Sequence, residues 1–288
     1  TKIQYENNLL SDAEIEVSSE LNLSEIPFDG PWKSLNQSAA QMLPVSAGRM
    51  PKIGVRICSQ MKVKQTVELR ISSKPFNHTP DVILETITID LKEGENMVSL
   101  SFAAIIPETC YAFVCFMKNI HASIQTSQML VTGLVSVFNK ILPEVSNWGK
   151  QTPPEDIGVE AFEFWCPERR PDGQNIAMHI NPGINCFSKE NLRTFPYRPV
   201  EKPNAWVADI DDDNPTITLT WKEPKEIKGI TLFTDTDYDH PMESVQWGHY
   251  DNRMPFCIRS YKIMDSRGNT FICESDIYQT MRIYVQVS

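Results

Sequence analysis

Short segments in which apolar and polar residues alternate recur through the first half of this chain. Residues 52–57 and 66–71 alternate with a period of two, and the strand-like residues 82–90 and 97–102 follow with short turns between them. Residues 111–117 are apolar on both faces, which is typical of a strand in the middle of a sandwich. Strands at this spacing, without a convincing long helix, predict an all-β fold built from β-sandwiches.

Prolines divide the chain into two strand-rich regions. Residues 141–175 form a connector rich in proline, and strand-like segments resume after it. In the second region, residues 266–269 separate two β-like runs, which is a strong hairpin signal. The sequence therefore predicts an N-terminal β-sandwich over residues 1–140, a packed connector over 141–175 and a second β-sandwich over 176–288, both of the jelly-roll type.

The charge of the chain disfavours two classes of partner. Its 288 residues carry a formal net charge of −10, and no basic stripe occurs. Nucleic acid or an anionic membrane surface would require clustered Lys and Arg, so neither is expected as a partner. The longest apolar stretches, such as residues 101–106 and 112–117, have the length of a strand. We therefore expect no membrane span.

The seven cysteines do not form a recognisable disulfide framework. Their number is odd and no Cys-x-x-Cys occurs. Buried reduced thiols are the favoured interpretation, and a disulfide between Cys166 and Cys186 is the alternative. The compartment stays open, with a periplasmic or secreted location favoured over the cytoplasm.

The last hundred residues resemble a known type of β-sandwich. An aromatic strand leads to an exposed acid in residues 204–209, and an apolar strand follows at 215–221. Residues 222–232 then place a proline turn before an Ile-x-Gly-Ile strand. This order resembles the galactose-binding-like, or discoidin-type, jelly roll. The resemblance implies a galactose-binding-like fold for the C-terminal region.

Motifs spread over nearly the whole chain resemble one family more closely. They are residues 198–199, 203–209, 233–237, 239–244, 248–249 and 253–257 in the second half, and residues 18–20, 41–45, 77–81 and 132–138 in the first. This combination resembles the C-terminal extension of bacterial FAD-dependent oxidoreductases of the Bacteroides and Planctomycetes type.

The resemblance implies a role without catalysis for these residues. A dinucleotide site needs Gly-x-Gly-x-x-Gly after a strand, and the 12 glycines of the chain contain no such spacing. FAD would therefore belong to a missing catalytic domain of the parent chain, and that domain would be the partner of this region. The expected function is a non-catalytic accessory or binding region of a larger FAD-dependent oxidoreductase. The alternative is a free-standing carbohydrate-binding β-sandwich protein.

An acidic loop in the second half is a candidate cation site. Asp209, Asp211 and Asp213 stand at positions one, three and five of a calcium loop. An EF-hand is excluded, because Asn214 replaces the required glycine and Thr220 the bidentate glutamate. The remaining alternatives are a simpler Ca²⁺ site made of carboxylates and carbonyls, and a solvated acidic loop, which is preferred.

The long loop after residues 230–233 carries most of the remaining polar side chains. Three carboxylates on one side of it would repel one another unless a cation lay among them, so either a ligand site or an ion-paired structural loop is expected. Its aromatic rings would suit the faces of sugars. The predicted ligand-binding residues are Asp235, Asp237, Asp239, His240, Trp247, His249, Tyr250 and Arg253. No nucleophile elbow or oxyanion-hole glycines accompany them, so no catalytic residue is predicted.

Overall fold

The computed structural model describes residues 9–73, 80–129, 136–139, 165–167, 175–194, 202–233, 260–274 and 282–286. Within these ranges the chain forms antiparallel β-sheets, and its helical segments are the short 3-10 turns η1 (Leu9–Asp12) and η5 (Lys189–Arg193). The predicted all-β fold is confirmed. No helix in the described ranges is long and apolar enough to cross a membrane.

The chain divides into two compact units. The sandwich unit comprises Asn22–Cys186 with Val200–Pro203, and the terminal unit comprises Thr1–Leu21, Phe187–Pro199 and Asn204–Ser288. This division differs from the predicted domains. Residues 1–21 group with the second half of the chain, and residues 176–186 group with the first.

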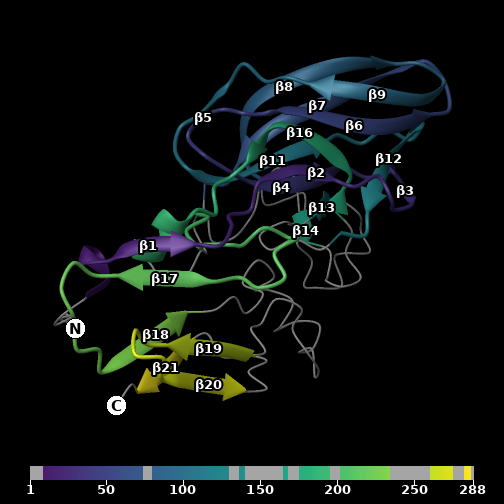
Figure 1. Ribbon diagram of the computed structural model, residues 1–288. Helices are drawn as coiled ribbons and strands as arrows, with labels where there is room; N and C mark the ends of the chain where they lie inside the picture. Colours follow the sequence, from purple (N-terminus) through teal and green to yellow (C-terminus); the bar gives the residue numbers. More distant parts are fainter. Residues whose placement is uncertain are drawn as a thin grey trace, which may run out of the picture. The chain divides into compact units, whose positions relative to one another are not determined.

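The sandwich unit contains two antiparallel sheets, whose strands are labelled in Figure 1. The six-stranded sheet has the order β14 (Trp165–Pro167), β13 (Ser136–Asn139), β4 (Ala39–Val45), β11 (Cys110–Phe116), β7 (Val63–Ile71) and β8 (Val82–Leu91). The seven-stranded sheet has the order β15 (Asn175–Ile176), β12 (Ala122–Ser127), β6 (Lys52–Ser59), β16 (Met178–Ile184) and β2 (Leu23–Ile26), with β3 (Trp32–Ser34) on β12 and β9 (Gly94–Leu100) on β6. The architecture is β-sandwich-like.

One long two-stranded ribbon builds most of both sheets. The paired residues, from its open end to its closed end, are Trp32 and Gln125, Val45 and Cys110, Ile53 and Leu100, and Ile71 and Val82. The short strands β5 (Gly48–Arg49) and β10 (Ile105–Ile106) continue the same pairing. Successive passes alternate between the sheets, because β3/β12 and β6/β9 lie in one and β4/β11 and β7/β8 in the other. The two-stranded ribbon therefore crosses from one sheet to the other after each pair of strands.

The alternating sequence of the ribbon explains the core of the sandwich unit. Ile53, Val55 and Ile57 of β6 are fully buried, while the residues between them are at least partly exposed. Val67 and Leu69 of β7 are also fully buried. Burying each such side chain stabilises the fold by about 1.5–3 kcal/mol. A shift of one residue in strand pairing would expose these side chains, so their alternation fixes the register of the strands.

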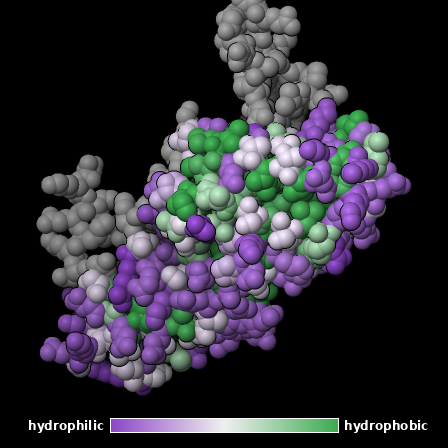
Figure 2. Space-filling view, turned by 90° about the horizontal axis from the view of Figure 1, so that it is seen from above, coloured by the Kyte–Doolittle hydropathy of each residue, from purple (hydrophilic) through white to green (hydrophobic). Residues whose placement is uncertain are grey.

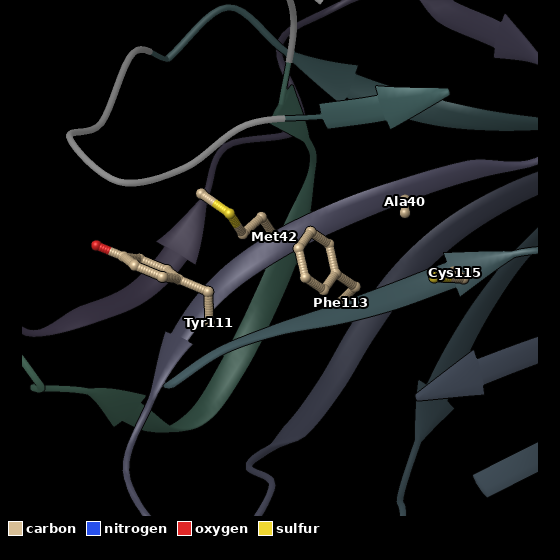
Figure 3. Packing of buried hydrophobic residues seen from close by; sticks show 5 residues of the cluster. All are labelled: Ala40, Met42, Tyr111, Phe113 and Cys115. Atoms are coloured by element: carbon tan, nitrogen blue, oxygen red, sulfur yellow. The ribbon is translucent and has the colours of Figure 1, made fainter. Parts of the chain in front are cut away.

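The six-stranded sheet is buried on both faces at its centre. Every residue of β4 and residues 111–116 of β11 are buried. One face carries the cluster shown in Figure 3, made of Ala40, Met42, Tyr111, Phe113 and Cys115. Met42 lies opposite Phe113 in the register, so both project to the same side. Two-sided burial confirms the expectation that residues 111–117 form a strand in the middle of a sandwich.

A buried amide links the two sheets. Gln41 of β4 donates from Nε2 to Asn175 Oδ1 of β15 (3.1 Å), and its Oε1 accepts the backbone N–H of Ile176 (2.7 Å). Asn175 Nδ2 in turn donates to the carbonyl of Met129 (2.7 Å). Because each buried amide has partners, this polar network fixes how the layers are aligned.

The terminal unit is made of three strand pairs within the described ranges. They are β1 (Glu14–Val17) with β17 (Ile217–Thr220), β18 (Gly229–Phe233) with β21 (Arg282–Gln286), and β19 (Ser260–Met264) with β20 (Thr270–Glu274). The last pair confirms the predicted hairpin. Gly268 in its turn has φ +85°, and Asp265 accepts the backbone N–H of Arg267 (2.9 Å) and Asn269 (2.8 Å).

Hydrogen bonds explain why residues 9–21 belong to the terminal unit. The backbone N–H of Leu21 donates to Val207 (2.9 Å), Trp206 Nε1 donates to the carbonyl of Ser19 (3.0 Å), and Trp221 Nε1 donates to that of Leu9 (2.8 Å). These pairs lie about two hundred residues apart. Periodicity is a local signal, so it cannot show which distant segment pairs with the strand at residues 14–17.

Candidate binding face

The outer face of the seven-stranded sheet carries the most distinctive side chains of the described chain. In β6, Ile53, Val55 and Ile57 point into the core, so Arg56 and Gly54 point outward. The register then identifies the outward residues of the neighbouring strands. We call the resulting set the binding face; it consists of Glu25, Phe28, Trp32, Arg56, Met97, Gln125 and His179.

A first row of these side chains crosses four strands. Arg56 lies opposite Met97 of β9, and Gln125 of β12 lies opposite Trp32 of β3. Ile124 pairs with Ile57, so the next residue, Gln125, falls beside Arg56. Trp32 is 39% exposed and Met97 57% exposed. The row therefore places an exposed indole, a half-buried amide whose oxygen is buried, a guanidinium and an exposed thioether in sequence.

A second row lies next to the first. His179 of β16 is opposite both Gly54 of β6 and Glu25 of β2. Its Nδ1 is 3.8 Å from Glu25 Oε1, and both side chains are about half exposed. An ion pair this exposed contributes little to stability. Both groups therefore remain open to a ligand.

Phe28 joins the two rows. The Arg56 guanidinium carbon lies 4.6 Å from the centre of the Phe28 ring, and the His179 ring centre lies 4.9 Å from it at a tilt of 54°. Gln125 Nε2 donates to the Phe28 carbonyl (2.9 Å). The ring orients the guanidinium and the imidazole before any ligand arrives.

The loop that carries Phe28 is tied to β12. The Asp29 carboxylate accepts the Ser127 hydroxyl (2.9 Å) and the backbone N–H of Gln128 (3.0 Å). The Gln128 N–H, followed by the Ser127 hydroxyl, lowers the pKa of Asp29. A Cβ on Gly30 would lie 2.7 Å from the backbone of Thr126, so the loop can approach the strand only with glycine there.

The surface of the molecule mixes apolar and polar residues. In the view of Figure 2, hydrophobic residues gather in patches between hydrophilic ones. Among the described residues, Ile83, Met97 and Ile105 are large apolar side chains that are more than half exposed. Exposed apolar side chains are ordinary on their own, and Met97 is notable because it extends a row of aromatic and polar groups.

The structure does not assemble the predicted calcium ligands. No group of three His, Cys, Asp or Glu side chains that could hold a metal occurs in the described part of the chain, which includes Asp209, Asp211 and Asp213. Asp209 Oδ1 instead accepts the N–H of Asp211 (3.1 Å). The neighbouring Asp212 accepts the hydroxyls of Ser18 (2.6 Å) and Ser19 (2.5 Å), and these hydroxyls lower its pKa. Local hydrogen bonds therefore hold the carboxylates of Asp209 and Asp212 in this loop.

The predicted ligand-binding loop lies outside the described residues. This applies to all of its members, namely Asp235, Asp237, Asp239, His240, Trp247, His249, Tyr250 and Arg253. Their role stays a prediction.

A small hollow near β11 is lined in part by the thiol of Cys110. Its lining includes Cys110, Tyr111 and Glu108. Burial, with the nearby Glu108 and Cys186, raises the pKa of Cys110 to about 11. Cys186 forms no disulfide, so it is not paired with Cys166, and its Sγ lies 3.5 Å from Ser46 Oγ. Both thiols stay protonated near neutral pH, which makes them poor nucleophiles.

Comparisons with known proteins add no relative. No protein-family model matches the chain, and no curated protein and no solved structure is significantly similar to it. The class that the structure defines is therefore a β-sandwich-like all-β protein, and its function must be argued from the binding face.

The binding face was not predicted from the sequence. Trp32 stands in a strand of three residues that has no clear alternation, and Phe28 stands in a loop. The available signal was the outward position of Arg56 in an alternating strand. That position becomes meaningful only once β3, β12 and β16 are placed beside β6.

Proposed function

We propose that this chain is a non-catalytic module that binds carbohydrate on its binding face. The observation that carries the proposal is the first row, where the exposed Trp32 indole lies beside Gln125 and Arg56. A pyranose ring has an apolar C–H face and a rim of hydroxyls. The indole suits the first, and the guanidinium donors suit the second.

The geometry favours an extended ligand over a small one. The row follows the sheet across β9, β6, β12 and β3, whose neighbours are about 4.8 Å apart. The face therefore spans more than one sugar unit. We propose an oligosaccharide or polysaccharide as the ligand class.

Affinity electrophoresis in gels containing soluble polysaccharides tests this function. The protein should be retarded by at least one polymer, and Trp32→Ala should weaken that binding about tenfold by removing the stacking surface. Ile120→Ala, which removes an exposed apolar side chain of the same unit from outside the face, should bind normally. Retardation by no polymer in a broad panel, or unchanged binding by Trp32→Ala, would contradict the proposal.

Within a longer protein, we propose that the module is an accessory region of an FAD-dependent oxidoreductase. This rests on the sequence motifs alone, and FAD would be held by the missing catalytic domain. The gene sequence before the codon for Thr1 tests it. A Gly-x-Gly-x-x-Gly motif between a strand and a helix is expected there. A secretion signal standing directly in its place would overturn the assignment.

The proposal has a counterpart in the fold. We propose that the sandwich unit is a jelly roll, which the rolled ribbon of residues 32–125 supports. We also propose that the terminal unit is galactose-binding-like, which rests on the motifs in residues 204–232.

A further inference from the structure

We infer that Arg56 makes this face specific for acidic sugars, by binding the carboxylate of a uronic acid. The inference rests on the proposed carbohydrate function and names the ligand class. It starts from the charge state of Arg56. Arginine stays protonated at every physiological pH, so its guanidinium always needs water or an anion at its N–H groups.

Arg56 has no acidic partner among the residues that the structure describes. No described carboxylate lies within ion-pair distance of it, although described ion pairs do occur at Arg70 with Glu68 and at His179 with Glu25. Glu25, the acid of the second row, is directed to His179. The guanidinium of Arg56 instead contacts the Phe28 ring.

That contact is made with an aromatic ring, so it engages none of the five N–H donors of the guanidinium in a conventional hydrogen bond. A ring against the guanidinium restricts its orientation. Two parallel N–H groups match the two oxygens of a carboxylate, which is the strongest common pairing of this side chain. Because the orientation is fixed in advance, less conformational entropy is lost on binding.

The position of Arg56 matches this role. It stands two strands from Trp32, with Gln125 between them. A sugar stacked on the indole would therefore place a neighbouring unit of the chain near the guanidinium. Long-range electrostatic attraction cannot produce a preference for acidic sugars, because the chain carries a net charge of −10 and repels polyanions.

Two polymers with one backbone test the inference. Polygalacturonate carries a free carboxylate on each unit, and its methyl ester carries none. Titration calorimetry at pH 7 with a chelator present should show about tenfold tighter binding of the free acid, as expected of one charge-assisted bidentate contact. Arg56→Gln should bind both polymers alike, at the affinity the original protein has for the ester.

Matched variants separate a specific contact from net charge. Lys52→Gln removes a positive charge from the same strand, at an outward position four residues from Arg56, and should keep the preference. Arg56→Lys keeps the charge without the planar fork and should lose most of it. Thermal unfolding of each variant checks that the fold is intact.

The outcomes distinguish the two proposals. Equal affinity of the original protein for acid and ester would overturn the role of Arg56 while leaving carbohydrate binding in place. Equal losses in Lys52→Gln and Arg56→Gln would also overturn it, since net charge would then explain the preference. Binding of no polysaccharide at all would remove the proposed function, and this inference with it.

Discussion

Gly30 holds the loop of Phe28 against β12, and its lack of a side chain is what permits the close approach. A Cβ there would lie 2.7 Å from the backbone of Thr126, well inside van der Waals contact. Backbone atoms in a sheet cannot move aside, so the loop must shift instead. The glycine at position 30 therefore allows the loop to pack on β12, and this packing positions Phe28 in the binding face.

Gly30→Ala should lower the free energy of unfolding by about 1–3 kcal/mol, the usual cost of overpacking. It should also weaken ligand binding, because Phe28 would no longer orient Arg56. Urea unfolding measures the first effect. Gly54→Ala is the matched control, since a Cβ there would meet His179 at an ordinary 3.5 Å. Equal stability changes in the two variants would contradict the geometry at Gly30.

Gln41→Leu should also be destabilising. It leaves the Ile176 N–H without its acceptor and Asn175 Oδ1 without the amide donor of Gln41, in a buried environment. An orphaned buried group costs about 1–3 kcal/mol. The exposed Gln60→Leu should change the unfolding midpoint very little. A cost for Gln41→Leu as small as that of Gln60→Leu would show that the network does not align the sheets.

Asp29 makes the stability of the sandwich unit depend on pH in the acid range. Its folded-state pKa is lowered from 3.8, chiefly by the Gln128 N–H. Its ionised form therefore stabilises the fold above the unfolded pKa, and this contribution is lost as pH falls through the folded pKa. The free energy of unfolding, measured with urea at each pH, should fall less between pH 5 and about 3 in Asp29→Asn than in the original protein. Asp90→Asn, which removes an exposed carboxylate of β8, should show the same fall as the original protein.

At the scale of elements, β1 is the strand whose role depends most on distant sequence. It pairs with β17 from Glu14 opposite Thr220 to Val17 opposite Ile217. Ile15 is buried in this pair. The N-terminal segment is therefore a structural part of the terminal unit.

Deleting residues 1–20 should loosen the terminal unit and leave the sandwich unit intact. Hydrogen exchange measured by mass spectrometry should become faster in β17 and near Val207, which lose their partners. Peptides from β6, β7 and β11 should exchange as before. Unchanged exchange in β17 would show that the pairing with β1 contributes nothing to that unit.

Alternation predicted individual strands well and failed where burial is two-sided. The structure has β6 at Lys52–Ser59 and β8 at Val82–Leu91, close to the predicted 52–57 and 82–90. β4 was not predicted, because all seven of its residues are buried and it contains Pro44. Alternation also does not show that β12, which ends at Ser127, and β13 lie in different sheets.

At the scale of the whole molecule, the sequence predicted an all-β protein but not its division into units. A domain that closes on itself through residues 9–21 leaves no local trace, because hydrogen bonds between residues two hundred positions apart have no period. The same reason hid the binding face. Trp32, Arg56 and His179 come from three separated strands, whereas the predicted ligand residues were neighbours in one loop.

The location of the ligand is the central claim, and hydroxyl-radical footprinting tests it most directly. Tryptophan and methionine react readily with radicals when exposed, and the chain offers both kinds of reporter. Trp32 and Met97 lie on the binding face, whereas Met61 and Met264 are exposed elsewhere. With saturating polysaccharide, oxidation of Trp32 and Met97 should fall while that of Met61 and Met264 stays constant. Protection of Trp247 or Tyr250 with Trp32 unchanged would contradict the claim and place the ligand on the loop of residues 235–253.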